Sequence, residues 1–349
     1  MSLQPIRPLL LTRIARRSAS GTARRAAALV SLLAPALALV LTAFPAPAAA
    51  QADRSLKIIL PVGPGSGVDT ITRAVAPMLS KMLGGQSVVI ENQPGAGGIP
   101  GTHAMIKSAP DGHTISLISN NHVIYPSVYK ALPFDPVADV TPLAIIGTTP
   151  LVLLVNPAKV PAKNAGELIA LLKAKPGVYN YASSGNGTIL HLAAEMFMDE
   201  AKVEARHIPY KGVGPMLADT IGGQVEMAVS ALPTVQGHLK NGTLRAIGVT
   251  GSARSAAAPE IPTVAEQGLP GYVVEAWIGA IGPKGMAPEQ VKRLHGALAA
   301  AFATPEVQEA MAKQGNAIRV STPEAAGQHL RAELDKYARL VKKAGIKVD

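Results

Sequence analysis

The stretch from Ile58 to Arg73 reads Ile-Ile-Leu-Pro-Val-Gly-Pro-Gly-Ser-Gly-Val-Asp-Thr-Ile-Thr-Arg, and the interpretation of the fold starts from it. It begins as a short apolar run, breaks at three glycines and continues with apolar residues at helical spacing. This order predicts a strand, a tight turn and the start of a helix. The first N–H groups of a helix have no partner within it and lie at the positive end of its dipole. The turn therefore predicts an anion site, for a carboxylate or a phosphate.

The glycine pattern of this turn argues against a nucleotide ligand. Gly63, Gly65 and Gly67 follow a G-x-G-x-G spacing with no lysine after them, so neither the dinucleotide fingerprint nor the P-loop is met. Glycines here allow positive φ and a close approach of the backbone to a ligand. Ser66, Asp69 or Thr70 is the expected helix cap. A purely structural turn that holds nothing stays open as an alternative.

A second turn of the same kind lies in the other half of the chain. Residues 179–182 read as a strand, Ser183-Ser-Gly-Asn-Gly-Thr188 as a Gly-rich turn, and 191–198 as a helix. One such turn in each half favours an α/β protein with two lobes that face one another. A cleft between lobes is a common ligand site.

The first 52 residues differ in composition from the rest of the chain. They carry six arginines and neither lysine nor acid, followed by the apolar run 26–44 and the small residues 45–52. This pattern predicts a secretory signal peptide, cleaved after Ala50 or Ala52, and hence a periplasmic protein. A permanent membrane anchor is the alternative, although Ser31 and Pro35 interrupt the apolar run.

Removal of that segment changes the meaning of the charge. The formal net charge of +10 falls to +4, because 27 basic residues remain against 23 acidic ones. No downstream cluster combines basic and aromatic residues, so a nucleic-acid partner is not expected. A mild positive charge suits an anionic solute.

The residue types argue against several kinds of chemistry. The absence of cysteine excludes disulfides and thiol catalysis, and no histidine pair has the spacing of a metal site, so no metal or cofactor is expected. Ser183, Ser184 and His191 suggest an exported serine hydrolase. Tyr181, however, stands where the first glycine of a nucleophile elbow belongs. The hydrolase remains an alternative.

We divide the mature chain into two lobes. The first lobe comprises residues 53–153 and 274–349, and the second lobe comprises 154–273. Polar residues 119–126 follow the strand expected at 114–118 and read as its exit loop. Proline at or near the first helical position predicts three C-terminal helices, at 288–302, 305–313 and 323–344.

Several separated motifs resemble one known family. In chain order they are 60–69, 91–98, 109–112, 125–130, 180–188, 208–212 and 262–266. Together they are similar to the tripartite tricarboxylate transporter substrate-binding proteins (TctC-like), also called the Bug family of periplasmic receptors. The resemblance implies a type II periplasmic binding fold whose lobes close on a small carboxylated solute. It also implies membrane permease subunits as partners. We expect a monomer.

The resemblance also implies which residues hold the solute. In that family the two Gly-rich turns grip it from opposite lobes, largely through backbone N–H groups. The resemblance implies that the first turn contacts the solute at Val62, Gly63, Pro64, Gly65 and Ser66. It implies that the second turn does so at Ser183, Ser184, Gly187 and Thr188. By chemistry and position, further candidates are Asp69, Asn120, Asn121, His191, Tyr210 and Ser230.

Three positions depart from the family pattern. Val62 stands where relatives commonly carry an aromatic residue, Ser66 replaces a glycine, and Ser230 stands where many carry aspartate. The loss of that carboxylate argues against a contact with an amino group on the solute. A role in sensing, through docking on a membrane sensor protein, stays open beside transport.

Overall fold

The computed structural model describes residues 55–344. The predicted signal peptide lies outside the described residues. Within them, no helix combines the length and the apolar character needed to span a membrane.

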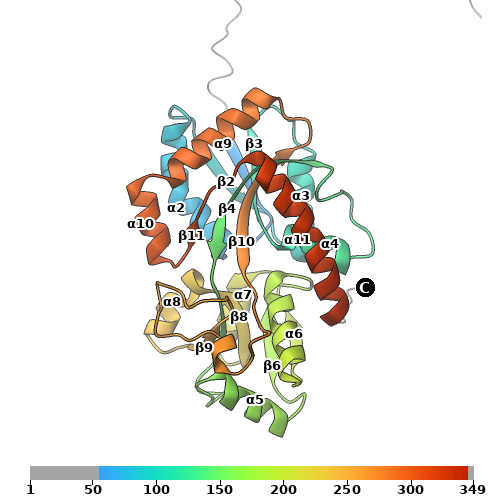
Figure 1. The fold of residues 1–349 in the computed structure, drawn as a ribbon, viewed down its shortest axis with the longest axis vertical. Coiled ribbons are helices and arrows are strands. Elements are labelled where there is room, and N and C mark those ends of the chain that lie inside the picture. The colour runs from blue at the N-terminus through green and yellow to red at the C-terminus, as the bar shows by residue number, and fades with distance from the viewer. Residues whose placement is uncertain (1–54, 345–349) are drawn as a thin grey trace, which may run out of the picture. The chain divides into compact units, whose positions relative to one another are not determined.

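The first lobe is built on a six-stranded sheet, seen in the upper half of Figure 1. In spatial order the strands are β11 (Ala317–Ile318), β4 (Val140–Thr149), β10 (Ala276–Pro283), β3 (Thr114–Ser119), β1 (Leu56–Leu60) and β2 (Val88–Asn92). The strand β1 pairs in parallel with both β2 and β3, and β10 pairs antiparallel with β3 and β4.

Helices cover this sheet. The predicted C-terminal helices have the bounds expected for them. The helices are α2 (Gly67–Met82), η2 (Ala96–Gly98), α3 (Ile99–Ile106), α4 (Asn121–Val128), α9 (Pro288–Phe302), α10 (Pro305–Lys313) and α11 (Pro323–Ala344).

The second lobe is built on a five-stranded sheet. In spatial order its strands are β7 (Arg206–Pro209), β6 (Asn180–Ser183), β8 (Met227–Ala231), β5 (Leu151–Val155) and β9 (Arg245–Val249). Its helices are α5 (Ala165–Ala174), α6 (Ile189–Ala201), α7 (Val213–Ile221), α8 (Leu232–Lys240) and η3 (Ala265–Gln267). The two sheets with their helices form the two α/β lobes that the sequence predicts.

The chain crosses between the sheets at two places that lie side by side. It passes from β4 to β5 through Pro150, and it returns from β9 to β10 through residues 250–275. The Thr250 hydroxyl donates a hydrogen bond to the Val274 carbonyl at 2.6 Å, and the Val274 N–H donates to the Thr250 carbonyl at 2.8 Å. These bonds hold the two ends of the returning segment together beside the crossing.

One expected loop is a helix. Residues 119–126 were expected to form an exit loop, yet α4 begins at Asn121 and contains Pro126. Val123, Ile124 and Tyr125 are fully buried. Burial of this apolar face outweighs the unfavourable proline, because most helical stability in proteins comes from packing rather than propensity.

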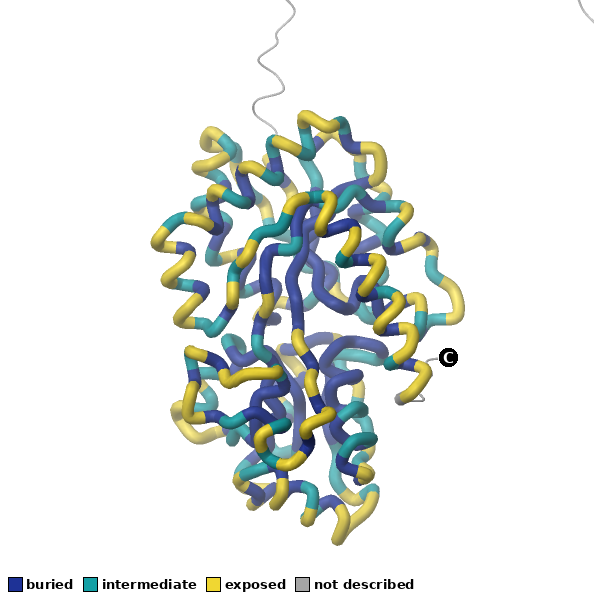
Figure 2. The backbone as a smooth tube through the Cα atoms, in the orientation of Figure 1, coloured by how far each residue is buried: buried dark blue, intermediate teal, exposed yellow. Residues whose placement is uncertain are grey.

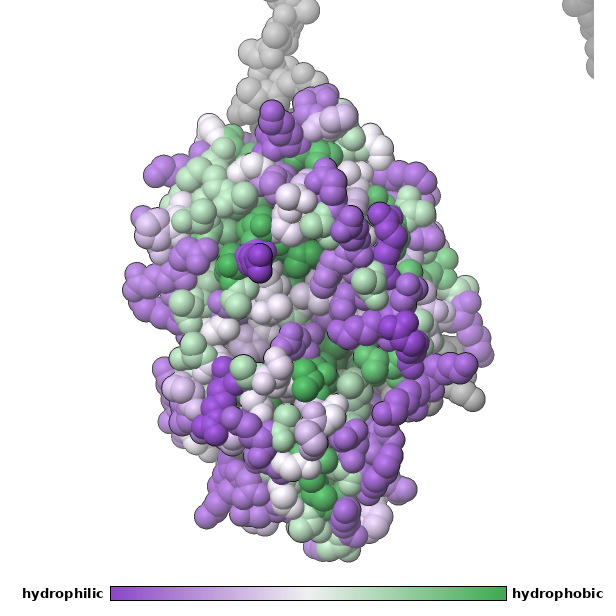
Figure 3. Space-filling model, viewed as in Figure 1, coloured by the Kyte–Doolittle hydropathy of each residue, from purple (hydrophilic) through white to green (hydrophobic). Residues whose placement is uncertain are grey.

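Buried residues follow the central strands of both sheets, and exposed residues follow the outer helical faces (Figure 2). One face of α11 packs against the rest of the protein, since Leu330, Tyr337 and Val341 are at most 2% exposed and Leu334 is partly buried. Hydrophilic side chains cover much of the visible face, with hydrophobic ones in smaller patches (Figure 3).

Candidate ligand-binding cleft

The first Gly-rich turn caps α2 with its own side chains. Ser66 Oγ accepts from the Asp69 N–H at 3.3 Å, and Asp69 Oδ2 accepts from the Gly65 N–H at 2.9 Å. The Gly67 and Val68 N–H groups, at the first two helical positions, have no acceptor among the described residues. These two donors, rather than Gly65, are therefore open to an anion.

Asp69 is held within this turn. Its Oδ1 accepts from Arg73 Nε at 3.0 Å and from Asn92 Nδ2 at 2.9 Å. Burial raises the pKa of Asp69, but the hydrogen bonds from Arg73, the Gly65 N–H and Asn92 outweigh that effect and hold the pKa below its ordinary value. Asp69 is thus an ionised group that organises the turn.

The second Gly-rich turn leads into α6 in a similar way. Thr188 Oγ1 accepts from the His191 N–H at 3.4 Å, and His191 Nδ1 accepts from the Gly187 N–H at 3.1 Å. The Ile189 N–H donates to Asn121 Oδ1, which belongs to the other lobe. The next N–H group, that of Leu190, has no acceptor among the described residues.

Two further helices of the second lobe begin at the same place. The helix α7 starts at Val213 after Gly212, whose φ of 141° is a left-handed value that favours glycine, and no side chain caps it. The helix α8 starts after Ala231 with a proline in its first turn. Residues from the first turns of α2, α6, α7 and α8 line one inner pocket. The positive ends of four helix dipoles therefore meet there.

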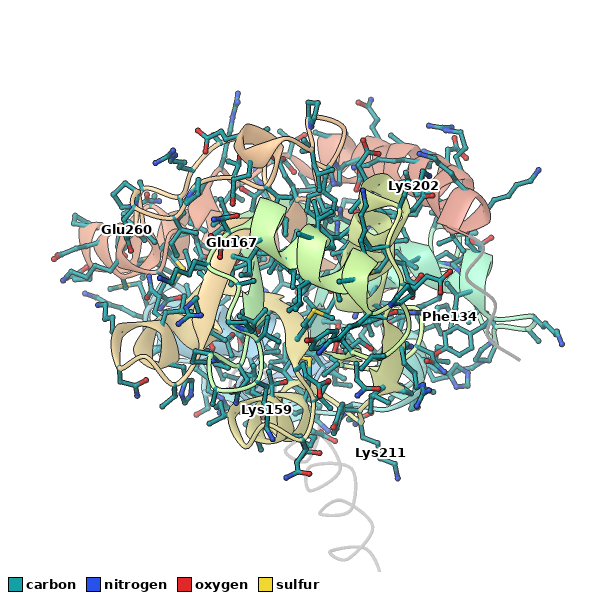
Figure 4. All side chains as sticks on the ribbon, turned by 90° about the horizontal axis from the view of Figure 1, so that it is seen from below. Phe134, Lys159, Glu167, Lys202, Lys211 and Glu260 are labelled. Atoms are coloured by element: carbon teal, nitrogen blue, oxygen red, sulfur yellow. The ribbon has the colours of Figure 1, made fainter. Side chains whose placement is uncertain are left out.

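Two adjoining pockets between the lobes form the cleft, with cavity volumes of about 60 Å³ and 40 Å³. No ionisable side chain is among the described residues that line the inner pocket. The outer pocket has one, Lys211, which is exposed and lies at the molecular edge in Figure 4. Both pockets are lined by Val62, Ser66, Asn121, Ser184 and Val213.

The lobes touch across this cleft at glycines. A Cβ atom built on Gly67 would lie 3.0 Å from the Cβ of Ala231, and one on Gly187 would lie 2.5 Å from Val128. Such close approach is possible only because these positions lack a side chain. The described structure is therefore a closed arrangement of the two lobes.

Of the residues predicted to hold the solute, about half line the cleft. They are Val62, Gly63, Ser66, Asn121, Ser184, Thr188 and Ser230. The others do not line either pocket: Pro64, Gly65, Asp69, Asn120, Ser183, Gly187, His191 and Tyr210.

Several of this second group have partners inside the protein. Asn120 Nδ2 donates to Tyr337 Oη at 2.7 Å, and its Oδ1 accepts from the Trp277 N–H at 3.0 Å. Tyr210 donates from its hydroxyl to Asp219 at 2.7 Å, and burial together with Asp219 raises the pKa of Tyr210 to about 12. These side chains position the walls of the cleft.

Ser183 contacts a histidine that the sequence analysis did not single out. Ser183 Oγ lies 2.6 Å from His207 Nε2, and the rings of His207 and His191 stack with centroids 3.9 Å apart. Burial, followed by the neighbouring His191, lowers the pKa of His207 to about 3, although Glu195 opposes this. Ser183 is fully buried and does not line the cleft. The pair lacks the access to substrate that a hydrolase nucleophile needs.

Sequence reasoning also missed two hydroxyls and left one wall residue undecided. Thr149 ends β4 and Thr234 lies in the first turn of α8, and both line the inner pocket. Trp277, which the sequence left between pocket wall and packing, lines the same pocket while 3% exposed. No local motif marks these positions, because the packing of the lobes brings them together.

Comparison with known proteins decides the family. The sequence pattern of the family described as "Tripartite tricarboxylate transporter family receptor" matches residues 71–346. The chain belongs to this receptor family. It is 35% identical to "Protein BugT" of Bordetella pertussis over 297 residues, which cover 84% of this chain and 90% of that one.

Solved structures of similar receptors share the fold. Periplasmic binding protein BugD superposes with a TM-score of 0.80 at 30% identity, covering 84% of this chain and 99% of its own. An R. palustris protein solved with adipate superposes with a TM-score of 0.81 at 29% sequence identity, and the match covers 84% of this chain and 99% of that one. MatC from Rhodopseudomonas palustris, solved with malate, superposes with a TM-score of 0.77 at 27% sequence identity, and the match covers 82% of this chain and 99% of that one. The family is one of periplasmic binding proteins with two lobes, as the motifs predicted.

Proposed function

We propose that this receptor captures a small carboxylate in the periplasm and delivers it to the membrane subunits of a tripartite tricarboxylate-type transporter. The observation that carries the proposal is the meeting of four helix N-termini at an interlobe pocket without an ionisable side chain. Such a site attracts an anion through backbone donors and helix dipoles.

The open donors come from both lobes. Gly67 and Val68 offer their N–H groups from the first lobe, and Leu190 and Val213 offer theirs from the second. A carboxylate that accepts from both sets links the lobes, and a hydrogen bond to a charged group contributes about 1.5–3 kcal/mol. Ligand binding thus favours the closed arrangement, as in hinge closure of binding proteins.

The relatives support a carboxylate as the ligand class. One similar receptor was solved with adipate and another with malate, and both ligands are dicarboxylates. In this proposal the receptor carries out no chemistry on the solute, residues 1–52 are removed on export, and the two lobes close on one another. The predicted lobe boundary between residues 153 and 154 falls inside β5 (Leu151–Val155), which belongs to the sheet of the second lobe, so the first crossing lies at Pro150.

A thermal-shift screen of organic acids, combined with native mass spectrometry of the protein purified from a periplasmic extract, tests the proposal. Malate, adipate and citrate are the first probes. A ligand at about 100 times its Kd adds about 2.7 kcal/mol to the free energy of unfolding, which is readily detected. Failure of every carboxylate to raise the unfolding temperature would overturn the proposal, as would turnover of a bound acid.

The two alternative functions have their own tests. An exported serine hydrolase should lose its activity on a simple ester in the Ser183→Ala and Ser184→Ala variants, and inactivity of the wild-type protein on such esters removes this alternative. A sensing role requires that a membrane sensor protein is retained on the immobilised receptor only in the presence of the carboxylate.

A further inference from the structure

Three buried hydroxyls of the inner pocket lack a partner. Thr149 Oγ1, Ser230 Oγ and Thr234 Oγ1 have no hydrogen-bond partner among the described residues, and all three residues line the pocket. Ser230 is fully buried and Thr149 is 6% exposed. Buried polar groups in proteins are normally paired, so unpaired ones in a ligand site indicate atoms of the ligand.

The Thr149 hydroxyl lies close to the first turn of α2, and Ser230 and Thr234 line the same pocket. A Cβ built on Gly67 would lie 3.9 Å from Thr149 Oγ1 and 3.0 Å from the Cβ of Ala231, the residue after Ser230. Thr234 follows Ser230 by four residues, at the start of α8. Gly67, whose N–H is open, and the Thr149 hydroxyl therefore lie at the same part of the inner pocket.

The charge of the pocket restricts what these hydroxyls can bind. No acidic side chain is present among the described lining residues, so an ammonium group there would be buried without compensation. A hydroxyl side chain both donates and accepts, and it therefore matches an uncharged oxygen such as a hydroxyl or a keto group.

We propose that Thr149, Ser230 and Thr234 recognise a second, uncharged oxygen on a carbon near the carboxylate of the ligand. The receptor then prefers hydroxy and oxo carboxylates to acids of the same length that lack this oxygen. The inference rests on the proposed function of carboxylate binding, and it names the ligand class within it. A site built to hydrogen-bond a hydroxyl discriminates strongly against the analogue without it, because its own polar groups are then left unpaired.

Calorimetric titration with matched acids tests the preference. The pairs are malate and succinate, 2-oxoglutarate and glutarate, and lactate and propionate. In at least one pair we expect the oxygenated acid to bind the wild-type receptor at least about tenfold tighter. Equal binding within every pair overturns the inference and leaves the receptor function standing. Absence of binding by all six acids, and by adipate and citrate, counts against the proposed function itself.

Variants assign the preference to the hydroxyls. The triple variant Thr149→Val, Ser230→Ala, Thr234→Val should bind the two acids of the preferred pair within about threefold of one another, with affinity for the plain acid retained. Each single variant should reduce the preference in part. Thr102→Val, a buried threonine of α3 outside the cleft, is the matched control and should keep the full preference.

Both outcomes of the variant experiment are decisive. A preference that survives in the triple variant overturns the assignment to these three side chains. Loss of folding is separated from loss of recognition by far-UV circular dichroism and by the retained binding of the plain acid. The single variants Ser230→Ala and Thr149→Val, which remove only unpaired atoms, keep the assignment testable if the triple variant does not fold.

Discussion

Asn121 Oδ1 accepts a hydrogen bond from the Ile189 N–H at 2.8 Å, and these two residues belong to different lobes. A side chain of the first lobe therefore accepts a hydrogen bond from the first N–H group of α6, which is a helix of the second lobe. This bond can exist only while the lobes are together. It also occupies one of the donors that a ligand oxygen would otherwise use.

Replacement of Asn121 should change both closure and affinity. In Asn121→Asp, a carboxylate at the N-terminus of α6 should stabilise the closed form without ligand and repel an anionic solute. We expect the affinity for the best-binding acid to fall at least about tenfold. Calorimetry measures the affinity and small-angle scattering the closure. Asn241→Asp adds the same charge at an exposed position after α8, and it should bind as the wild type does. Unchanged affinity in Asn121→Asp would contradict the role of this bond.

The fluorescence of Trp277 should report binding. It is the single tryptophan of the chain, it lines the inner pocket, and its Nε1 donates to Glu333 Oε2 at 2.8 Å. A ligand in the pocket should alter its emission in proportion to occupancy. Emission that does not change when the ligand is added would place the solute elsewhere.

The hydrogen bond between Trp277 and Glu333 should contribute to stability. Glu333→Leu leaves the indole N–H without an acceptor and should lower the free energy of unfolding by about 1–3 kcal/mol, whereas Glu333→Gln keeps an acceptor and should lower it less.

Acid should destabilise the protein through His207. Burial, together with His191, lowers its folded-state pKa to about 3 from 6.5. Between those pH values the unfolded chain binds a proton that the folded protein does not, so stability falls as the pH falls through this window and is fully retained above it. His207→Gln removes this contribution. Thermal unfolding from pH 7.5 to pH 4, with His238→Gln on α8 as control, should show a weaker pH dependence for His207→Gln alone.

Gly67 should limit how closely the lobes approach. In Gly67→Ala the new Cβ would lie 3.0 Å from the Cβ of Ala231, so the two lobes must separate by a few tenths of an ångström to accommodate it. We expect roughly tenfold weaker ligand binding with an unchanged unfolding temperature without ligand, because alanine suits the first turn of a helix. Ala231→Gly in the same chain removes the clashing atom and should restore affinity. Failure of this double variant to recover would point to another cause.

Local signals in the sequence predicted much of the fold. The helices α9, α10 and α11 begin at Pro288, Pro305 and Pro323 as expected, because proline suits the first helical turn wherever the chain folds. The helix α4 was expected as a loop, and α8 was not predicted. Tertiary burial stabilises α4 despite the proline within it, and a short-range pattern does not contain that information.

The candidate site likewise contains some residues that a local sequence pattern marks and others that only tertiary packing brings there. Gly-rich turns before helices are local features, and the family resemblance that rests partly on them implied Ser66, Ser184 and Thr188 as ligand contacts. Each of the three lines the cleft. Thr149 and Thr234 carry no local signal. They line the inner pocket because β4 ends there and α8 begins there.

Residue type and short spacing are enough to specify the two Gly-rich turns, the family resemblance and the absence of cysteine chemistry. Which backbone donors remain open to a ligand depends instead on tertiary packing. Asp69 takes the Gly65 N–H and Asn121 takes that of Ile189, while Gly67, Val68 and Leu190 keep theirs. Each backbone donor finds its acceptor in space: Asp69 lies four residues from Gly65, whereas Asn121 lies in the other lobe, 68 residues from Ile189 in the chain.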